Sequence, residues 1–347
     1  MSGDQGSPTY VVLRTDKIGD VVLSLPVAEA IKVSRPAAKV AYVTSRSTSD
    51  LARACPFVDR VVEYEESSTS WGATRRLARD LKGLRAQAAV FLRPTLHTAI
   101  AAVLAGIPVR AGTAYRSYSL LFNRRVREHR RRAARHESQY NMDVLRAVLE
   151  VEDRAYSPRI MVPESSRSYA EGALRDMGLK RKTFVALHPG SAGSARNLPL
   201  ASYAALADAI EQDIGIPLVV TCGPNEADLI GEMDGLRKVK SRVLVGTARL
   251  LDLAAVIAEA CIFVSGSTGP MHLASAVGTP TASFFSPARS CSPRRWAPIG
   301  ATRKIIMPPV AECTRCVGRE CRHYDCMEKI ETGPVVESIR ALLQACR

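Results

Sequence analysis

Residues 10–33 read YVVLRTDKIGDVVLSLPVAEAIKV and contain a complete strand, loop and helix. The run at 10–14 is rich in β-branched residues, which predicts a short strand. Residues 20–33 read as a helix, and Gly19 permits the tight turn before it. A strand that leads through a short loop into a helix is the repeating unit of parallel sheets covered by helices.

The same alternation extends outward along the chain in two series. The first adds strands at 39–43, 60–64 and 88–92 and helices at 71–84 and 95–104. The second begins near Thr183, with helices between strands at 184–188, 217–222, 243–245, 261–265 and 281–285. The intervening residues 154–166 contain two prolines and no helical pattern, so they read as a linker.

These patterns predict an α/β protein built from two Rossmann-like, doubly wound domains. We expect the first domain at 1–160, the second at 161–330, and a helix within 331–347 that could pack back on the N-terminal domain. Ligands of such sheets bind at the carboxyl ends of the strands. Two such domains facing one another would form a central cleft.

The composition of the chain restricts its location. No apolar stretch reaches the roughly 18 residues that a transmembrane helix requires. Residues 1–9 lack the features of a signal peptide. We therefore predict a cytoplasmic protein.

The charge of the chain points to anionic partners. The formal net charge is +14, and the seven arginines from Arg124 to Arg135 are opposed only by Glu128. Such a run attracts anionic lipid head groups or phosphorylated sugars, although an ordinary solvated loop is an equally open interpretation. Nucleic acid is not predicted as a partner, because the sequence shows no nucleic-acid-binding motif and no interleaved aromatic residues.

The loop after the first strand reads Arg14-Thr15-Asp16-Lys17-Ile18-Gly19-Asp20. Asp20 is expected near a helix N-terminus at the carboxyl edge of the sheet, where a carboxylate could act as a base. It could equally be a helix-capping residue, which the helix dipole favours. The loop is not a GxGxxG sequence, so a dinucleotide-binding fingerprint is not supported.

Three loops of the second half carry residues suited to a nucleotide. In 188–197, small residues and the fixed charge of Arg196 suit a diphosphate, and a flexible polar connection is the alternative. In 265–272, Thr268 can cap a helix, and His272 could donate to a phosphate or serve as a structural histidine. In 222–226, Glu226 follows a strand end, where a carboxylate can accept ribose hydroxyls.

Together these loops resemble those of glycosyltransferase family 9, the ADP-heptose:lipopolysaccharide heptosyltransferases. The most specific pieces are 17–20, 188–197 and 267–274, in this order and at this spacing, and the similarity runs from about Tyr10 to Ala345. The resemblance implies a GT-B fold with the active site between the two domains. It also implies inverting transfer of heptose from ADP-heptose to a lipopolysaccharide inner-core precursor, with no metal or nicotinamide cofactor required. Since such a precursor lies at the inner membrane surface, the resemblance implies a cytoplasmic protein that could associate peripherally with that membrane.

By this resemblance, Asp20 is the expected general base, and Arg196 stabilises the departing diphosphate. The donor-binding residues are then Ser191, Ala192, Arg196, Glu226, Ser267, Thr268, Gly269 and His272. For the acidic, phosphorylated acceptor we select Asp16, Lys17, Arg116, Arg124 and Arg125. The chain departs from the family pattern at Ser267, where many members have Asp, and at Leu198, where Trp is usual.

Four of the nine cysteines form a cluster, Cys313, Cys316, Cys321 and Cys326. A C-x-x-C pair with two further thiols could hold a structural zinc or iron ion, and free thiols are the equally open alternative.

Two other functions stay open on the sequence. One is a transferase of the same fold with another nucleotide-sugar donor or with a protein acceptor, that is, a protein-modifying heptosyltransferase. The other is a nucleotide-sugar-binding protein without catalysis. Asp20 favours an enzyme, whereas Ser267 argues mildly for the binding protein.

Overall fold

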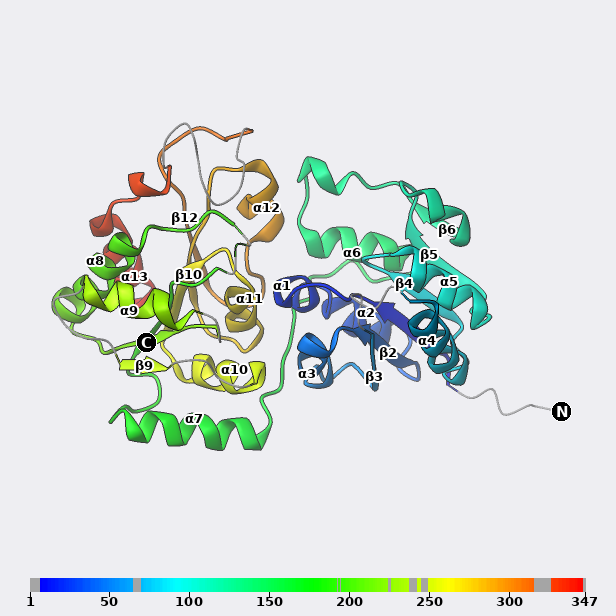
Figure 1. The fold of residues 1–347 in the computed structure, drawn as a ribbon, viewed down its shortest axis with the longest axis horizontal. Helices are drawn as coiled ribbons and strands as arrows, with labels where there is room; N and C mark the ends of the chain where they lie inside the picture. The colour runs from blue at the N-terminus through cyan, green and yellow to red at the C-terminus, as the bar shows by residue number, and fades with distance from the viewer. Residues whose placement is uncertain are drawn as a thin grey trace. The chain divides into compact units, whose positions relative to one another are not determined.

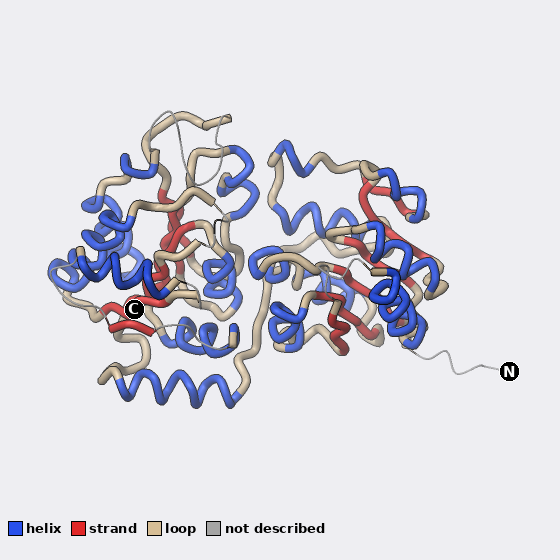
Figure 2. Tube along the Cα trace, in the orientation of Figure 1, coloured by secondary structure: helices blue, strands red, loops and turns tan. Residues whose placement is uncertain are grey.

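The structure is a computed structural model, and it describes residues 7–64, 70–191, 193, 195–223, 226–236, 242–244, 249–314 and 326–345. The chain forms two compact units. The first comprises Met1–Arg130 and Arg135–Met161, and the second comprises Arg131–Ala134 and Val162–Arg347. Strands and helices alternate along both (Figure 2).

Six parallel strands form the sheet of the first unit, in the order β3-β2-β1-β4-β5-β6. They are β1 (Thr9–Leu13), β2 (Lys39–Thr44), β3 (Arg60–Glu63), β4 (Ala88–Phe91), β5 (Val109–Thr113) and β6 (Arg124–Val126). All of β4 is buried, as is β1 after its first residue, because helices cover both faces of this sheet.

Each face of the first sheet has its own helices (Figure 1). On one face, α4 (Trp71–Gly83) and α5 (Leu96–Leu104) pack together against Val11, Leu13 and Phe91. On the other face, α2 (Pro26–Ser34) contacts β1 and β2, and α6 (Glu137–Arg146) contacts β4 and β5. The connections contain α1 (Ile18–Val22), α3 (Ser49–Arg53) and the 3-10 turns η1 (Arg46–Thr48), η2 (Ser117–Leu121) and η3 (Arg130–Arg132).

The single helix expected at 20–33 is two helices, α1 and α2, separated by residues 23–25. Pro26 is the first residue of α2. Proline has no N–H to donate and restricts the residue before it, so a new helix starts at Pro26 more easily than an existing helix passes through it.

The sheet of the second unit repeats the topology of the first. Its order, read from the β9 edge, is β9-β8-β7-β10-β11-β12, so both sheets follow the doubly wound order 3-2-1-4-5-6. The strands are β7 (Val185–His188), β8 (Leu218–Thr221), β9 (Arg242–Leu244), β10 (Ile262–Gly266), β11 (Thr281–Phe284) and β12 (Arg303–Ile306).

Two cores enclose this second sheet. One joins Val185 and Leu187 to α8 (Leu200–Ala209), α9 (Ala227–Gly235) and α13 (Thr332–Ala345). The other joins Phe184 and Phe263 to α7 (Glu164–Asp176), α10 (Leu250–Glu259) and α11 (Gly269–Ala276). The remaining elements are α12 (Pro293–Trp296), the π-helical turn η4 (Ile210–Ile214), η5 (Arg289–Cys291) and η6 (Met327–Lys329). Among the described residues, no helix has both the length and the apolar character needed to cross a membrane.

The position of α13 corrects one expectation. Val335, Ile339 and Leu343 of this helix are buried in the core that contains Val185 and Leu187, so the helix is part of the second unit. The sequence had left open that it packs on the N-terminal domain. An apolar stripe marks a helix as amphipathic but does not specify which sheet it covers.

Candidate active site

Both sheets reverse their strand order at one place, between β1 and β4 in the first unit and between β7 and β10 in the second. Loops that leave the two strands at such a place diverge, which opens a crevice at the carboxyl ends of the strands. The loop 14–20 follows β1, while the loops 188–197 and 265–272 follow β7 and β10. The most specific motifs of the sequence therefore lie at these two places.

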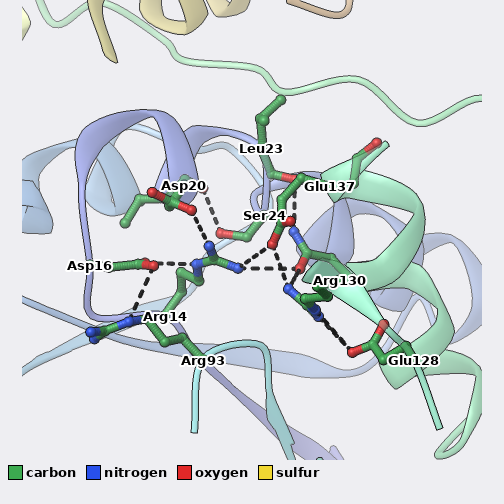
Figure 3. A network of polar contacts seen from close by, with 12 residues as sticks. Arg14, Asp16, Asp20, Leu23, Ser24, Arg93, Glu128, Arg130 and Glu137 are labelled. Carbon is green, nitrogen blue, oxygen red and sulfur yellow. Dashed lines mark hydrogen bonds and ion pairs between the residues drawn. The ribbon is translucent and has the colours of Figure 1, made fainter. Parts of the chain in front are cut away.

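Asp20 is the third residue of α1, which begins at Ile18. The N-cap residue is Lys17, so the interpretation of Asp20 as the cap is wrong. The Asp20 carboxylate instead accepts a hydrogen bond from Nη2 of Arg14, the residue that follows β1 (Figure 3). The Asp20 side chain is 19% exposed, so it contacts a buried cation and is still accessible from solvent.

Arg14 is the centre of a buried network of charges (Figure 3). Its Nε donates to Oδ1 of Asp16 at 2.7 Å, and its Nη1 donates to Oε1 of Glu137 at 3.0 Å. Glu137 begins α6, is almost completely buried and also accepts from Nη1 of Arg130 at 2.5 Å. One guanidinium therefore joins three carboxylates: Asp16 and Asp20 from nearby positions in the sequence, and Glu137 from 123 positions away.

The surroundings of Asp20 tune its protonation. Burial raises the pKa of the Asp20 carboxyl to about 6; Asp16 and Glu137 act in the same direction, and Arg14 opposes them. Burial by itself lowers the pKa of Arg14, but the three carboxylates raise it well above its ordinary value, so the guanidinium stays charged. A carboxylate with a pKa near neutrality can both accept a proton and release it again at physiological pH.

Asn197 fixes the loop after β7. Its Nδ2 donates to the carbonyl of Pro189 at 2.5 Å, and its Oδ1 accepts from the hydroxyl of Tyr203 at 2.8 Å. A side chain on Gly266 would collide with this Oδ1, so a glycine at the end of β10 allows the two loops to approach one another. Arg196, the adjacent residue, is 9% exposed.

Glu226 lies close to two glycines and a histidine. Its Oε2 accepts from the backbone N–H of Gly223 at 2.8 Å and lies 3.8 Å from Nε2 of His188, and a Cβ at Gly190 would collide with the same carboxylate. Burial lowers the pKa of His188 to about 4, although Glu226 opposes this, so the imidazole is neutral. Its Nδ1 lies 3.0 Å from the hydroxyl of Thr221. Glu226 is thus fixed just beyond a strand end, where a carboxylate can accept ribose hydroxyls.

Thr268 is the N-cap residue of α11, but its side chain makes no capping hydrogen bond. Its Oγ1 is buried and has no hydrogen-bond partner within the described part of the chain. A buried hydroxyl beside the first N–H groups of a helix is a set of donors suited to an anion. Gly269 begins this helix, and His272 lies buried in its first turn.

The structure describes Ser191 and Ser267 of the predicted donor site but not Ala192. Ser191 lies in the described part of the loop after β7, whereas Ala192 lies outside the described residues. Ser267 immediately precedes Thr268 at the end of β10.

The arginine-rich segment does not behave as one solvated run. Arg130 binds the buried Glu128 at 2.9 Å as well as Glu137, and Arg135 binds Asp143 at 2.7 Å. These two arginines therefore have structural partners within the first unit.

The three arginines predicted to bind the acceptor do not share one face. Arg124 and Arg125 are exposed neighbours on β6, so their side chains point to opposite faces of the sheet. Arg124 lines a pocket of about 520 Å³ together with residues 146–151. Arg116 lies elsewhere, as the N-cap residue of η2.

The cysteine cluster is only partly described. Cys313 forms an isolated bridge with Ala288, and Cys326 is buried in the core of the second unit. Cys316 and Cys321 lie outside the described residues. The described residues contain no group of three or more His, Cys, Asp or Glu that could hold a metal ion, so the zinc or iron site stays a prediction.

Comparison with known proteins agrees with this geometry. The family model described as glycosyltransferase family 9 (heptosyltransferase) matches residues 74–326. The chain belongs to glycosyltransferase family 9. It is 30% identical over 311 residues to a presumed glycosyltransferase of Haemophilus influenzae, a match that covers 87% of this chain and 90% of the relative.

Two solved structures share the fold of this family member. A family 9 glycosyltransferase from Veillonella parvula matches with a TM-score of 0.84 at 20% identity, covering 97% of each chain. Escherichia coli ADP-heptose lipopolysaccharide heptosyltransferase II matches with a TM-score of 0.78 at 20% identity, covering 97% of this chain and 99% of the other. The predicted GT-B architecture of two Rossmann-like domains is confirmed, and the protein is a glycosyltransferase of a heptosyltransferase family.

Sequence reasoning missed the residues that surround the predicted ones. It gave no role to Arg14, Glu137 or His188, and it placed Arg130 within a charged run. Arg14 and His188 could have been found from the sequence by one signal, since each is a polar residue at the carboxyl end of an apolar strand sequence. Glu137 carries none, because a glutamate in the first turn of a helix is ordinary.

Proposed function

We propose that this protein is an inverting heptosyltransferase that uses ADP-heptose as donor and a lipopolysaccharide inner-core precursor as acceptor. The observation that carries the proposal is the Asp20 carboxylate, bound by Arg14 after β1 and with its pKa raised to about 6. The donor and acceptor class are supported by the name of the Escherichia coli structure of the same fold.

In the proposed reaction, an acceptor hydroxyl attacks the anomeric carbon of the heptose while the bond from that carbon to the ADP oxygen breaks. The hydroxyl proton passes to Asp20, which later releases it to solvent. The products are the heptosylated acceptor and ADP. The base needs no cofactor, because burial, together with the charges of Asp16 and Glu137, raises its pKa to about 6.

The second unit supplies the proposed donor site. Arg196 and the N–H groups that follow Thr268 stabilise the negative charge that grows on the departing diphosphate. Glu226 binds the ribose hydroxyls, and Ser191, Ser267, Gly269 and His272 complete the site. In the first unit, Asp16 and Lys17 lie beside the base, and Arg116, Arg124 and Arg125 provide positive charge for the acceptor.

The test is Asp20→Asn, measured as ADP release from ADP-heptose with a lipopolysaccharide inner-core precursor as acceptor. We expect turnover to fall by roughly 100-fold or more, since general-base catalysis commonly contributes that much, while ADP binding stays unchanged. Asp50→Asn is the matched control, because the Asp50 side chain is 48% exposed and forms an ion pair with nearby Arg53 in α3. Undiminished turnover of the Asp20 variant would remove this residue as the base.

The donor is tested separately, by thermal shift of the wild-type protein with ADP, UDP and GDP. A larger shift with ADP than with the other two nucleotides is expected. A preference for UDP or GDP would replace ADP-heptose by another donor and leave the role of Asp20 untouched.

A further inference from the structure

The exposed large apolar side chains are unevenly distributed over the described residues. Six of the ten lie between residues 71 and 120, namely Trp71, Leu96, Val103, Leu104, Tyr115 and Leu120. The other four are scattered between Met161 and Met307. Four of these six lie on helix α5 and on the turn η2 that contacts it, and exposed apolar side chains that gather in one place indicate a surface covered by something other than water.

Helix α5 contributes three of these side chains. None of the residues in Leu96–Leu104 is charged, and Leu96, Val103 and Leu104 are exposed while Ala99 and Ala102 face the core. A helix on the surface of a protein ordinarily places charged residues on its outer face. The outer side of α5 is therefore apolar without serving the core of the first unit.

The turn η2 packs against α5 and extends this surface. It contains Leu120, which is 77% exposed and is the most exposed large apolar residue described. Two arginines bind the residues that follow Leu120: Nε of Arg110 donates to the carbonyl of Leu121 at 2.8 Å, and Nε of Arg125 donates to that of Phe122 at 3.0 Å. Arg116 is the N-cap residue of the same turn. Fixed positive charge thus surrounds an apolar tip.

The sequence of this region contains no acidic residue at all. Residues 81–127 include eight lysines and arginines and no aspartate or glutamate, although acidic residues make up 34 of 347 in the whole chain, about one in ten. A second copy of this chain, with a net charge of +14, would be repelled by such a surface. Nucleic acid would satisfy the arginines but would leave the leucines without an apolar partner.

We propose that α5 and η2 form a docking surface for an anionic lipid bilayer, into which Leu104 and Leu120 insert while Arg116 and Arg125 contact lipid phosphates. Apolar side chains that enter the head-group region together with cations that bind anionic lipids are the two elements of interfacial membrane binding. The docking surface shares Arg116 and Arg125 with the proposed acceptor site, but it does not depend on the donor or on the role of Asp20, so vesicle binding tests it separately from the proposed reaction.

The experiment is co-sedimentation of the full-length protein with vesicles of phosphatidylethanolamine containing roughly one-third phosphatidylglycerol. Vesicles of phosphatidylcholine alone provide the uncharged comparison. We expect the wild type to bind the anionic vesicles and to be released as the salt concentration rises. The double variant Leu104→Ser, Leu120→Ser should bind at least about tenfold more weakly than the wild type, because it loses two inserted side chains.

Two further variants complete the design. Leu236→Ser with Met307→Ser removes two exposed apolar side chains from the second unit and should bind as the wild type does. Arg116→Gln with Arg125→Gln should lose binding to anionic vesicles while the melting temperature stays close to that of the wild type. The proposal is overturned if the wild type ignores anionic vesicles, or if the leucine double variant binds them as the wild type does. It is equally overturned if the wild type is a dimer that this variant dissociates.

Discussion

The character of Asp20 follows from a competition between burial and a single neighbouring cation. Desolvation disfavours the carboxylate, and the negative charges of Asp16 and Glu137 add to that effect. Arg14 opposes them but is shared among three carboxylates, one of which, Glu137, it holds at 3.0 Å. Sharing explains how an aspartate can contact an arginine directly and still have a pKa of about 6.

This balance predicts the pH dependence of turnover. Asp20 must be deprotonated to accept a proton, so kcat/KM should rise with pH through about 6 and level off above it, falling roughly tenfold for each unit below. In Glu137→Gln, a charge that raises the pKa of Asp20 is removed, so the midpoint should move to lower pH. The profile is measured with saturating acceptor. Glu164→Gln, an exposed change in α7, should leave it in place. An unshifted or higher midpoint for Glu137→Gln would contradict this account.

The N-terminus of helix α11 carries the hydrogen-bond donors of the proposed phosphate site. Threonine at an N-cap normally accepts a hydrogen bond from the first turn, but Thr268 does not, and its hydroxyl is buried without a partner among the described residues. A buried unpaired hydroxyl costs stability, which a bound phosphate would recover. Pro270 in the first turn lacks an N–H, so the donors are those of its neighbours.

The change Thr268→Val tests this interpretation of α11. ADP affinity should fall roughly tenfold or more, because a hydrogen bond to a charged group is lost. The unfolding free energy without ADP should stay unchanged or rise, since the unpaired hydroxyl is gone. Thr281→Val is the matched control, because the hydroxyl of Thr281 in β11 is also buried without a partner in the described parts of the chain, and this change should leave ADP binding intact. Calorimetric titration with ADP distinguishes the two variants. Equal affinity in both would refute the role of Thr268.

The two units of the molecule share one sheet topology, and helix α13 packs into the core of the second unit. Both units place their loops at a reversal of strand order, which is why the candidate residues of each unit gather at carboxyl ends of strands. The second unit depends in addition on α13, which supplies five buried apolar residues to the core under α8 and β7. The end of the chain is therefore part of the fold of the proposed donor-binding unit.

Dependence on α13 predicts a stability effect far from any loop of the site. Ile339→Ala should lower the unfolding free energy of the second unit by about 2–5 kcal/mol, because Ile339 is completely buried. Gln344→Ala, an exposed change in the same helix, should alter it by less than about 0.5 kcal/mol. Thermal unfolding followed with and without ADP reports on this unit. Equal stability of the two variants would show that α13 is not part of its core.

Much of the fold and part of the site can be predicted from local sequence. The strands at 10–14, 39–43 and 184–188 and the loops that follow them were predicted close to where they occur, because burial and turn formation depend on adjacent residues. Strand β5 and the edge strands β6 and β12 were missed. All three contain mostly exposed or half-buried residues, including arginines, so they lack the apolar run of a buried strand.

The sequence alone therefore determines three things about this protein: its family, its two-domain α/β architecture and the identity of its candidate loops. Only the tertiary structure decides which residues the members of those loops contact. Arg14 and Glu137 are 123 positions apart, and α13 joins a core built mainly from residues more than 100 positions before it. Pairing of charges and placement of a helix depend on which surfaces meet when the chain packs, and no local pattern encodes that meeting.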